Sequence, residues 1–298
     1  MKKKRLLFIF LLMLIFSTPH IGAQQMPLVR FGLLSDIQYC NCDDYGTRFF
    51  SRTLARIDEC VAHFNRQQVH FTINLGDFTE KNQSDLNAVL RPLTKLNHRS
   101  YNITGNHDHT DVVNTSRLYR RLGMEAPYYS FTFNNIVFVM LNTNDVASYR
   151  LLRGMKSRRA LSQMLLQIKK DGRSNGYRWN GGIGKEQLQW LHAQLQSAEE
   201  AGQQVYLFSH HPLYPNGSFS ALNDVEVLSV ISNFTCVKAM FAGHYHAGVF
   251  AAFGTIPCIT VEGMVETADT TAFAVVELYS NKFVVHGAGR VKSKEIYF

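Results

Sequence analysis

The 298-residue chain has little of the residues that mark unusual classes of protein. It contains 7 Pro, 20 Gly and 2 Trp, and 18% of its residues are charged, whereas 46% are hydrophobic. A chain with this much apolar side chain can bury a core, which excludes disorder, a collagen-like repeat and a low-complexity scaffold. Because no linker rich in Pro, Gly or Ser divides it, we expect one domain over residues 24–298.

Cysteine is scarce as well. An odd number of cysteines cannot all pair within one chain, and a domain of this size does not depend on covalent cross-links. We therefore expect one or two disulfides at most, with the pairing left open. The spacing of Cys40 and Cys42 is too tight for a zinc ribbon, which needs two C-x-x-C pairs. The five cysteines are Cys40, Cys42, Cys60, Cys236 and Cys258.

Dense positive charge is confined to the N-terminus. The formal net charge is +8, but the segment 2–5 supplies four of the positive charges and no acidic residue precedes Asp36. The rest of the chain has 27 basic and 23 acidic residues, without a Lys/Arg block dense enough to follow a nucleic-acid backbone. We expect no nucleic-acid partner.

Long hydrophobic runs are absent beyond the first residues. Leu6–Phe16 is apolar over 11 residues, whereas a membrane-spanning helix needs about 20. A basic head, a short apolar run and the small residue Ala23 are typical of a secretory signal peptide. We therefore expect residues 1–23 to be removed after Ala23, leaving a secreted or periplasmic protein without a stable membrane anchor. An uncleaved anchor is the alternative, and the oligomeric state is left open.

Apolar runs and helical spacings alternate along the rest of the chain. The short apolar runs predict strands, and segments with apolar residues at helical spacing predict helices. Asn134-Asn135 between two strands predicts a hairpin, whereas residues 149–182 are less regular and are expected to form an insertion. The expected strands are 28–34, 70–75, 99–104, 128–133, 136–141, 205–208, 237–242, 249–253, 256–262, 273–278 and 283–286, and the expected helices are 48–67, 85–96 and 185–201.

Polar side chains follow the ends of five of these strands. Each of the five ends in a short loop that carries Asp, Asn, Gln or His. In an open α/β sheet the ligand site lies beyond the carboxyl ends of the strands, so we expect these side chains to converge. Carboxylate, amide and imidazole ligands suit a pair of divalent ions such as Mn, Fe or Zn. The candidate metal ligands are Asp36, Gln38, Asp77, Asn106, His210, His244 and His246, with His107 beside them.

Two metal ions about 3.5–4 Å apart need a carboxylate that bridges them. Asp77 is the candidate because we expect its strand to be central in the sheet. Gly105 and Gly243, which precede other ligands, let the backbone turn sharply next to the ions. The i, i+2 spacing of His244 and His246 puts both imidazoles on one side of an extended segment, where each can serve one ion.

The ordered motifs resemble those of the calcineurin-like metallophosphoesterases. They are D-x-Q at 36–38, G-D at 76–77, G-N-H-D at 105–108, S-H-H-P at 209–212 and G-H-Y-H at 243–246. The usual first motif of this family is D-x-H, and glutamine in its place is a feature of the manganese-dependent ADP-ribose/CDP-alcohol diphosphatases. The segments W-N-G-G and E-G-M-V-E-T-A also resemble that subfamily. The resemblance covers about residues 31–291.

The resemblance implies a fold and a set of residue roles. The fold would be a four-layer α/β/β/α sandwich of two mixed sheets. His107 would not touch metal but would face the phosphate as a general acid or a positive clamp, which makes it a catalytic residue together with Asn106. By position, Asp36, Gln38, Asp77 and His246 would hold the first ion, and Asp77, Asn106, His210 and His244 would hold the second.

The same resemblance implies an activity. The protein would be an exported hydrolase that cleaves the phosphoanhydride bond of nucleoside diphosphate-X compounds, such as ADP-ribose and CDP-alcohols, with a metal-bound hydroxide as nucleophile. One alternative is a phosphodiesterase or phosphomonoesterase that acts on cyclic nucleotides or simple phosphate esters. A metal-free binding module on the same fold is disfavoured because the ligand set is intact.

Gln38 bears on the choice of metal. An amide oxygen is a harder and weaker ligand than imidazole, so it favours Mn over Zn in the first position. We expect two divalent ions. Mn is the preferred metal, with Fe, Zn or Mg as alternatives, and we expect activity to need added Mn.

Other side chains near the motifs carry less information. His109 and His211 are interpreted as exposed groups or as neighbours of the ligands, not as ligands. Trp179 is interpreted as a packing residue that could also border the substrate pocket. Tyr39 and Tyr45 could either stack on a nucleobase or pack in the core.

Overall fold

The computed structural model describes residues 26–110, 112, 114–150, 154–266 and 268–298. The expected signal peptide, residues 1–23, lies outside this range. Among the helices within it, none has the length and apolar character that crossing a membrane requires.

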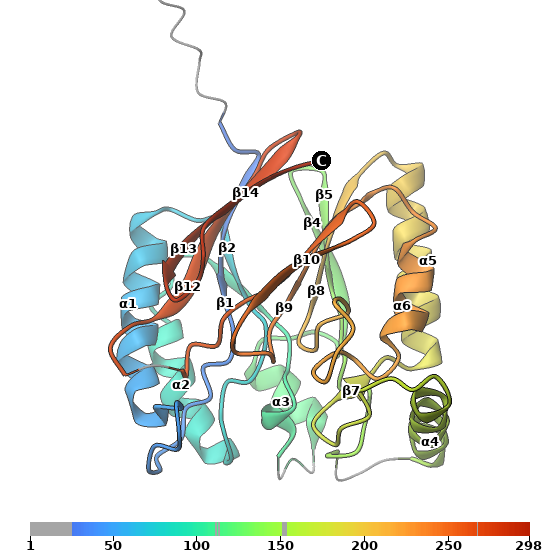
Figure 1. The fold of residues 1–298 in the computed structure, drawn as a ribbon. Coiled ribbons are helices and arrows are strands. Elements are labelled where there is room, and N and C mark those ends of the chain that lie inside the picture. The colour runs from blue at the N-terminus through green and yellow to red at the C-terminus, as the bar shows by residue number, and fades with distance from the viewer. Residues whose placement is uncertain (1–25, 111, 113, 151–153, 267) are drawn as a thin grey trace, which may run out of the picture.

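Two six-stranded mixed sheets form the centre of the molecule (Figure 1). Parallel strands have antiparallel neighbours on one side in the first sheet and on both sides in the second. In order, the first sheet is β14 (Lys294–Tyr297), β13 (Lys282–Gly289), β12 (Ala272–Leu278), β1 (Val29–Leu34), β2 (Phe71–Asn74) and β3 (Arg99–Asn102). The second is β10 (Val249–Phe253), β11 (Ile256–Thr260), β9 (Val237–Ala242), β8 (Gln204–Ser209), β5 (Ile136–Met140) and β4 (Tyr129–Phe133).

Helices cover the outer face of each sheet, which gives the expected α/β/β/α order (Figure 1). On the first sheet lie α1 (Thr53–Arg66) and α2 (Leu86–Leu93), and on the second lie α5 (Lys185–Glu200) and α6 (Asp224–Ile231). Helix α1 forms here because Ile57, Val61 and Phe64 recur at helical spacing and bury one face. The layer between the sheets is aromatic, with the ring of Phe31 5.6 Å from that of Phe71.

The sequence-based element assignments hold for most of the chain. The Asn134-Asn135 hairpin is confirmed, because both residues have the positive φ, 48° and 61°, that its turn requires. Cys40 and Cys42 form a disulfide, within the expected limit, and the other three cysteines are buried and free.

The prediction of an irregular insertion over residues 149–182 is wrong. This stretch contains α4 (Met155–Lys170) and the short strand β7 (Gly181–Gly182), which pairs with β6 (Val146–Ala147). Helix α4 has a weak apolar pattern in the sequence, because Leu161 and Ile168 are its only buried residues.

Several smaller elements are not foreseen by the sequence. They are α3 (Thr115–Arg121), α6, β6, β7 and β14.

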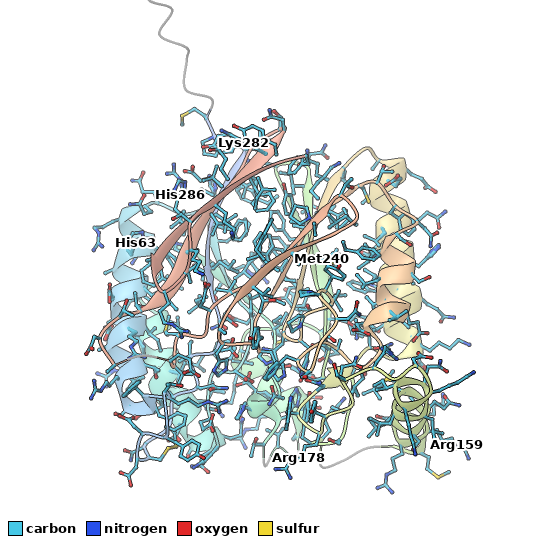
Figure 2. All side chains as sticks on the ribbon, viewed as in Figure 1. His63, Arg159, Arg178, Met240, Lys282 and His286 are labelled. Atoms are coloured by element: carbon cyan, nitrogen blue, oxygen red, sulfur yellow. A yellow bond between two sulfur atoms is a disulfide. The ribbon has the colours of Figure 1, made fainter. Side chains whose placement is uncertain are left out.

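The loops that follow β1, β2, β3, β8 and β9 gather at the end of the molecule where α3 and β7 lie (Figure 1). Figure 2 shows Arg159 of α4 and Arg178 at this same end, whereas Lys282 of β13 lies at the opposite end. The expectation that Asp77 follows a central strand is wrong, because β2 is second from the edge of its sheet. Asp77 is nevertheless central to the candidate site, because that site draws side chains from both sheets.

Candidate metal centre

The predicted ligands meet at the loop ends of both sheets. Six of them are buried, and the seventh side chain, His246, is 10% exposed. Asp36, Gln38, Asp77 and Asn106 come from the first sheet, and His210, His244 and His246 come from the second. Segments up to 210 positions apart therefore contribute to one buried polar cluster.

Asp77 contacts members of both predicted ligand sets. Its Oδ2 accepts a hydrogen bond of 3.0 Å from Gln38 Nε2 and lies 3.3 Å from His210 Nε2. Asn106 Oδ1 lies 3.1 Å from the same His210 nitrogen. On the other side of the cluster, His246 Nε2 lies 3.3 Å from Asp36 Oδ1. This arrangement is the one that a bridging carboxylate at Asp77 requires.

The histidines of the cluster each have one ring nitrogen engaged with a neighbouring oxygen. His210 Nδ1 is 2.8 Å from the Leu75 carbonyl, and His246 Nδ1 is 2.7 Å from Glu266 Oε1. His244 Nε2 is 3.0 Å from Asn180 Oδ1. A hydrogen bond from one ring nitrogen leaves the other with a lone pair, which is how metal-binding histidines are oriented in proteins.

A divalent cation fits these donors. Gln38 Oε1 is buried without a hydrogen-bond partner, and Asp36 Oδ1 has only the longer contact with His246; an unsatisfied buried acceptor is costly. Around Asp77, His210 Nε2 and several oxygens face one another, and all of them are electron-pair donors once the ring has lost its extra proton. A cation resolves both features, and a mixture of carboxylate, amide and imidazole ligands suits Mn²⁺ and similar ions.

The electrostatics of the metal-free cluster also favour positive charge. Burial would lower the pKa of His210, but the Asp77 carboxylate outweighs burial and raises it to about 9. In the same way Asp36 and Glu266 overcome burial and raise the pKa of His246 to about 9. Burial opposes ionisation of Asp77, yet His210 and His107 hold its pKa well below the usual value. The cluster therefore stabilises cationic charge between its carboxylates.

Strained backbone places the ligands. Asp36, Gln38, Asp77 and His244 all have positive φ, between 44° and 66°. Such conformations cost non-glycine residues about 1–3 kcal/mol each and persist where the surroundings enforce them, typically at functional sites. Gly105 allows the closest approach, because a Cβ there would lie 2.0 Å from Asp77 Oδ1.

Asp108 ties two of the ligand loops together, a role that the sequence did not reveal. Its carboxylate accepts hydrogen bonds from the backbone of Asp77 (2.8 Å), Phe78 (2.8 Å) and Gly105 (2.9 Å). Burial and the neighbouring Asp77 raise the pKa of Asp108 to about 7, against the effect of these hydrogen bonds. The G-N-H-D motif was the only sequence signal for this residue.

His107 lies beside the cluster rather than in it. Its backbone N–H donates to Asp77 Oδ1 at 2.9 Å, and its ring Nδ1 lies 2.9 Å from the Glu80 carbonyl and 3.2 Å from Glu80 Oε2. With Nδ1 engaged, Nε2 is the ring atom that can meet a substrate. The side chain is 24% exposed, as a group that reaches a phosphate must be. Glu80, which holds this ring, was missed by sequence reasoning.

His109 and His211 are buried neighbours and not exposed groups. His211 lies within ligand distance of His210 and His244, but both of its ring nitrogens are engaged, with Thr143 Oγ1 at 2.7 Å and the Trp179 carbonyl at 3.1 Å. Burial lowers the pKa of His109 and of His211 to about 3. The two contacts of His211 leave it no free lone pair for a metal, whereas His109 Nδ1 is buried without a hydrogen-bond partner.

Aromatic side chains line one rim of the centre. Trp179 is 36% exposed and stacks on Tyr177 with 4.4 Å between ring centroids. Phe219, missed by sequence reasoning, is 37% exposed and lies 4.8 Å from Tyr245 and 5.7 Å from His244. Trp179 therefore borders the site, whereas Tyr39 packs against the core beside α1.

Comparison with known proteins agrees with this geometry. The model of the calcineurin-like phosphoesterase family matches residues 29–248. The chain belongs to this family. Family membership confirms the expected enzyme class, a metal-dependent phosphoesterase or diphosphatase that acts by hydrolysis.

Individual members of the family resemble the chain over nearly its whole length. A rice (Oryza sativa subsp. japonica) protein named manganese-dependent ADP-ribose/CDP-alcohol diphosphatase is 28% identical, over 94% of this chain and 97% of the relative. A bovine (Bos taurus) protein of the same name is 27% identical, over 89% and 92%. The crystal structure of a dimetal phosphatase from Danio rerio superposes with a TM-score of 0.82 and 25% identity, covering 91% of this chain and 99% of that one.

Proposed function

We propose that the protein is a manganese-dependent hydrolase of nucleoside diphosphate-X compounds such as ADP-ribose and CDP-alcohols. The observation that carries the proposal is the buried cluster in which Asp77 contacts Gln38 on one side and His210 on the other. The relatives that match the chain over most of its length carry the name of this activity.

Two ligand sets that share Asp77 would hold the ions. The first is Asp36, Gln38, Asp77 and His246, and the second is Asp77, Asn106, His210 and His244. Divalent ions bound there supply charge neutralisation for phosphate oxygens and make a bound water far more acidic. The Gln38 amide supports the choice of manganese, since a hard oxygen ligand favours Mn over Zn.

The chain's own residues position the phosphate and move a proton. His107 is the candidate acid: with Nδ1 held by Glu80, its Nε2 can carry the proton that passes to the departing oxygen. Asp108 keeps the Asp77 and Asn106 loops at a fixed separation through its backbone hydrogen bonds. The exposed faces of Trp179 and Phe219 suit a nucleobase at the rim.

A substrate panel tests the proposal. The purified protein is stripped of metal and assayed with and without Mn²⁺ on ADP-ribose, CDP-choline, a cyclic nucleotide and p-nitrophenyl phosphate. We expect activity only with added Mn²⁺ and the highest kcat/KM on the two diphosphates. Preference for the cyclic nucleotide or the aryl ester would favour the phosphodiesterase or phosphomonoesterase alternative, and full activity of the stripped protein would contradict metal dependence.

We also propose that the protein is exported and processed after Ala23. The support is the basic head and apolar run of residues 2–16. The mass of the protein isolated from its native cells tests this, because removal of the signal predicts a mature N-terminus at Gln24. A full-length cytoplasmic protein would contradict it.

A further inference from the structure

Asn180 contacts the metal centre although it lies in none of the metal motifs. It follows Trp179 in the segment between α4 and β7, and it is 1% exposed. Its side chain reaches His244, which is 64 positions away in the sequence. Sequence reasoning included Asn180 only as part of a stretch that resembles a subfamily and gave it no role.

The orientation of the Asn180 amide is fixed by its other contacts. Its Nδ2 donates to the backbone carbonyls of Asn175 and Ser218, both at 2.8 Å. These two hydrogen bonds use both amide hydrogens. Rotating the amide by 180° would place its oxygen against two carbonyl oxygens and its NH₂ group toward His244. The geometry therefore sets Oδ1 as the atom that faces His244 Nε2 at 3.0 Å.

An amide oxygen can only accept a hydrogen bond, so His244 Nε2 must carry the proton. In a neutral imidazole this leaves the lone pair on Nδ1, the one ring atom then able to bind a metal. We propose that Asn180 is a positioning residue that fixes His244 in the Nε2–H tautomer and so prepares its Nδ1 for the second ion. The proposal rests on the metal centre proposed above, but the tautomer is a property of the metal-free protein.

The segment is also held by contacts that do not involve the Asn180 side chain. Asn175 Nδ2 donates to the Ala221 carbonyl at 2.7 Å, and the Trp179 carbonyl accepts from His211 Nε2 at 3.1 Å. The His244 backbone is held independently, because its N–H donates to Asp36 Oδ2 at 3.0 Å. Loss of the Asn180 side chain should therefore change the proton position on the His244 ring more than the position of the loop.

The tautomer can be measured without metal. Two-bond ¹H–¹⁵N spectra of metal-free protein labelled with ¹⁵N-histidine distinguish the two tautomers, and a His244→Gln variant identifies the signal. We expect the Nε2–H form in the wild type and a mixture of forms in Asn180→Ala. A wild-type Nδ1–H form, or an unchanged signal in Asn180→Ala, would overturn the proposal.

Metal affinity provides the second measurement. Calorimetric titration of metal-free protein with Mn²⁺ should show one of two sites weakened about 10–100-fold in Asn180→Ala. Asn180→Asp keeps an acceptor for His244 if its second oxygen is protonated and donates to one of the two carbonyls, and it should then retain the Nε2–H tautomer and lose less affinity. Equal losses in the two variants, with unchanged near-ultraviolet circular dichroism, would show that the acceptor does not matter and would refute the role.

Asn175→Ala is the matched control. It removes side-chain hydrogen bonds from the same segment but keeps the backbone carbonyl that holds Asn180. It should leave the tautomer of His244 unchanged, and a shift equal to that of Asn180→Ala would overturn the proposal. If the wild type binds no Mn²⁺ yet shows the expected tautomer change, the proposed function fails while the positioning of the ring stands.

Discussion

His244 and His246 are two residues apart on one loop, yet their surroundings differ. His246 donates to a carboxylate, Glu266, whereas His244 donates to a neutral amide, Asn180. Burial lowers the pKa of both rings. In His246, Asp36 and Glu266 outweigh burial and raise the pKa to about 9. In His244, burial acts together with His211 and His210, and the pKa lies well below its usual value. Burial and the charged groups around each ring, rather than its place in the motif, set its basicity.

This difference matters because the two rings are assigned to different ions. A carboxylate partner makes an imidazole a stronger ligand than a neutral partner does. The ion held by His246, however, also depends on Gln38, a weak amide ligand. The account therefore predicts two sites whose affinities respond to different substitutions.

Removal of the shared ligand should have the largest effect. Asp77→Ala takes one carboxylate from both ligand sets, so we expect Mn²⁺ binding at both sites to be lost. Activity should fall by more than the roughly 100-fold that loss of an outer partner costs. Calorimetry and kcat/KM with ADP-ribose measure this, and retention of one intact site would contradict a bridge at Asp77.

Loss of His107 should separate catalysis from metal binding. His107→Gln removes the candidate acid but leaves all seven predicted ligands, so kcat should fall about 10²–10⁴-fold while both Mn²⁺ affinities stay within a few-fold of wild type. If Mn²⁺ binding fell together with kcat, His107 would be a ligand rather than an acid.

Glu266→Gln should weaken the site of His246, whereas Asn180→Ala should weaken the site of His244. The variant replaces a charged partner of His246 with a neutral one, and we expect Mn²⁺ affinity at one site to fall about 10–100-fold. The double variant should weaken both sites, because the two supports contact different rings. A single site that is weakened by both substitutions would remove the distinction between the two histidines.

The smallest predicted effect concerns how the free energy of unfolding of the metal-free protein depends on pH. The folded-state pKa of His246 is raised to about 9. Its protonation therefore contributes fully to stability below about pH 6.5, and this contribution is lost as the pH rises through 9. Glu266→Gln should reduce this loss by on the order of 1 kcal/mol, since a hydrogen bond between charged groups disappears. Asn180→Ala should not reduce it. Urea unfolding at pH 6.5 and pH 9 measures the difference.

The residues of the buried cluster could be predicted from sequence because each follows a recognisable strand end. Asp36, Asp77 and His210 come directly after apolar runs, and the carboxyl ends of neighbouring strands must meet. The place of β2 near the edge of its sheet could not be judged, since strand order depends on pairing between distant segments. Helix α4 was missed because Leu161 and Ile168, seven positions apart, leave too weak an apolar pattern.

The residues that support the ligands could not be predicted. Glu266 and Asn180 act through single contacts with His246 and His244, across 20 and 64 positions of sequence. No spacing rule marks such contacts, because they exist only after the two sheets have packed. Phe219 reaches the rim in the same way, on the loop after β8 but beyond the S-H-H-P motif.

The most direct test of the account is a crystal structure of the protein with Mn²⁺, measured with anomalous scattering. We predict two anomalous peaks about 3.5–4 Å apart, both within bonding distance of the Asp77 carboxylate, with His246 and Gln38 at one and His210, His244 and Asn106 at the other. A single peak, or two peaks that do not share Asp77, would contradict the dinuclear centre.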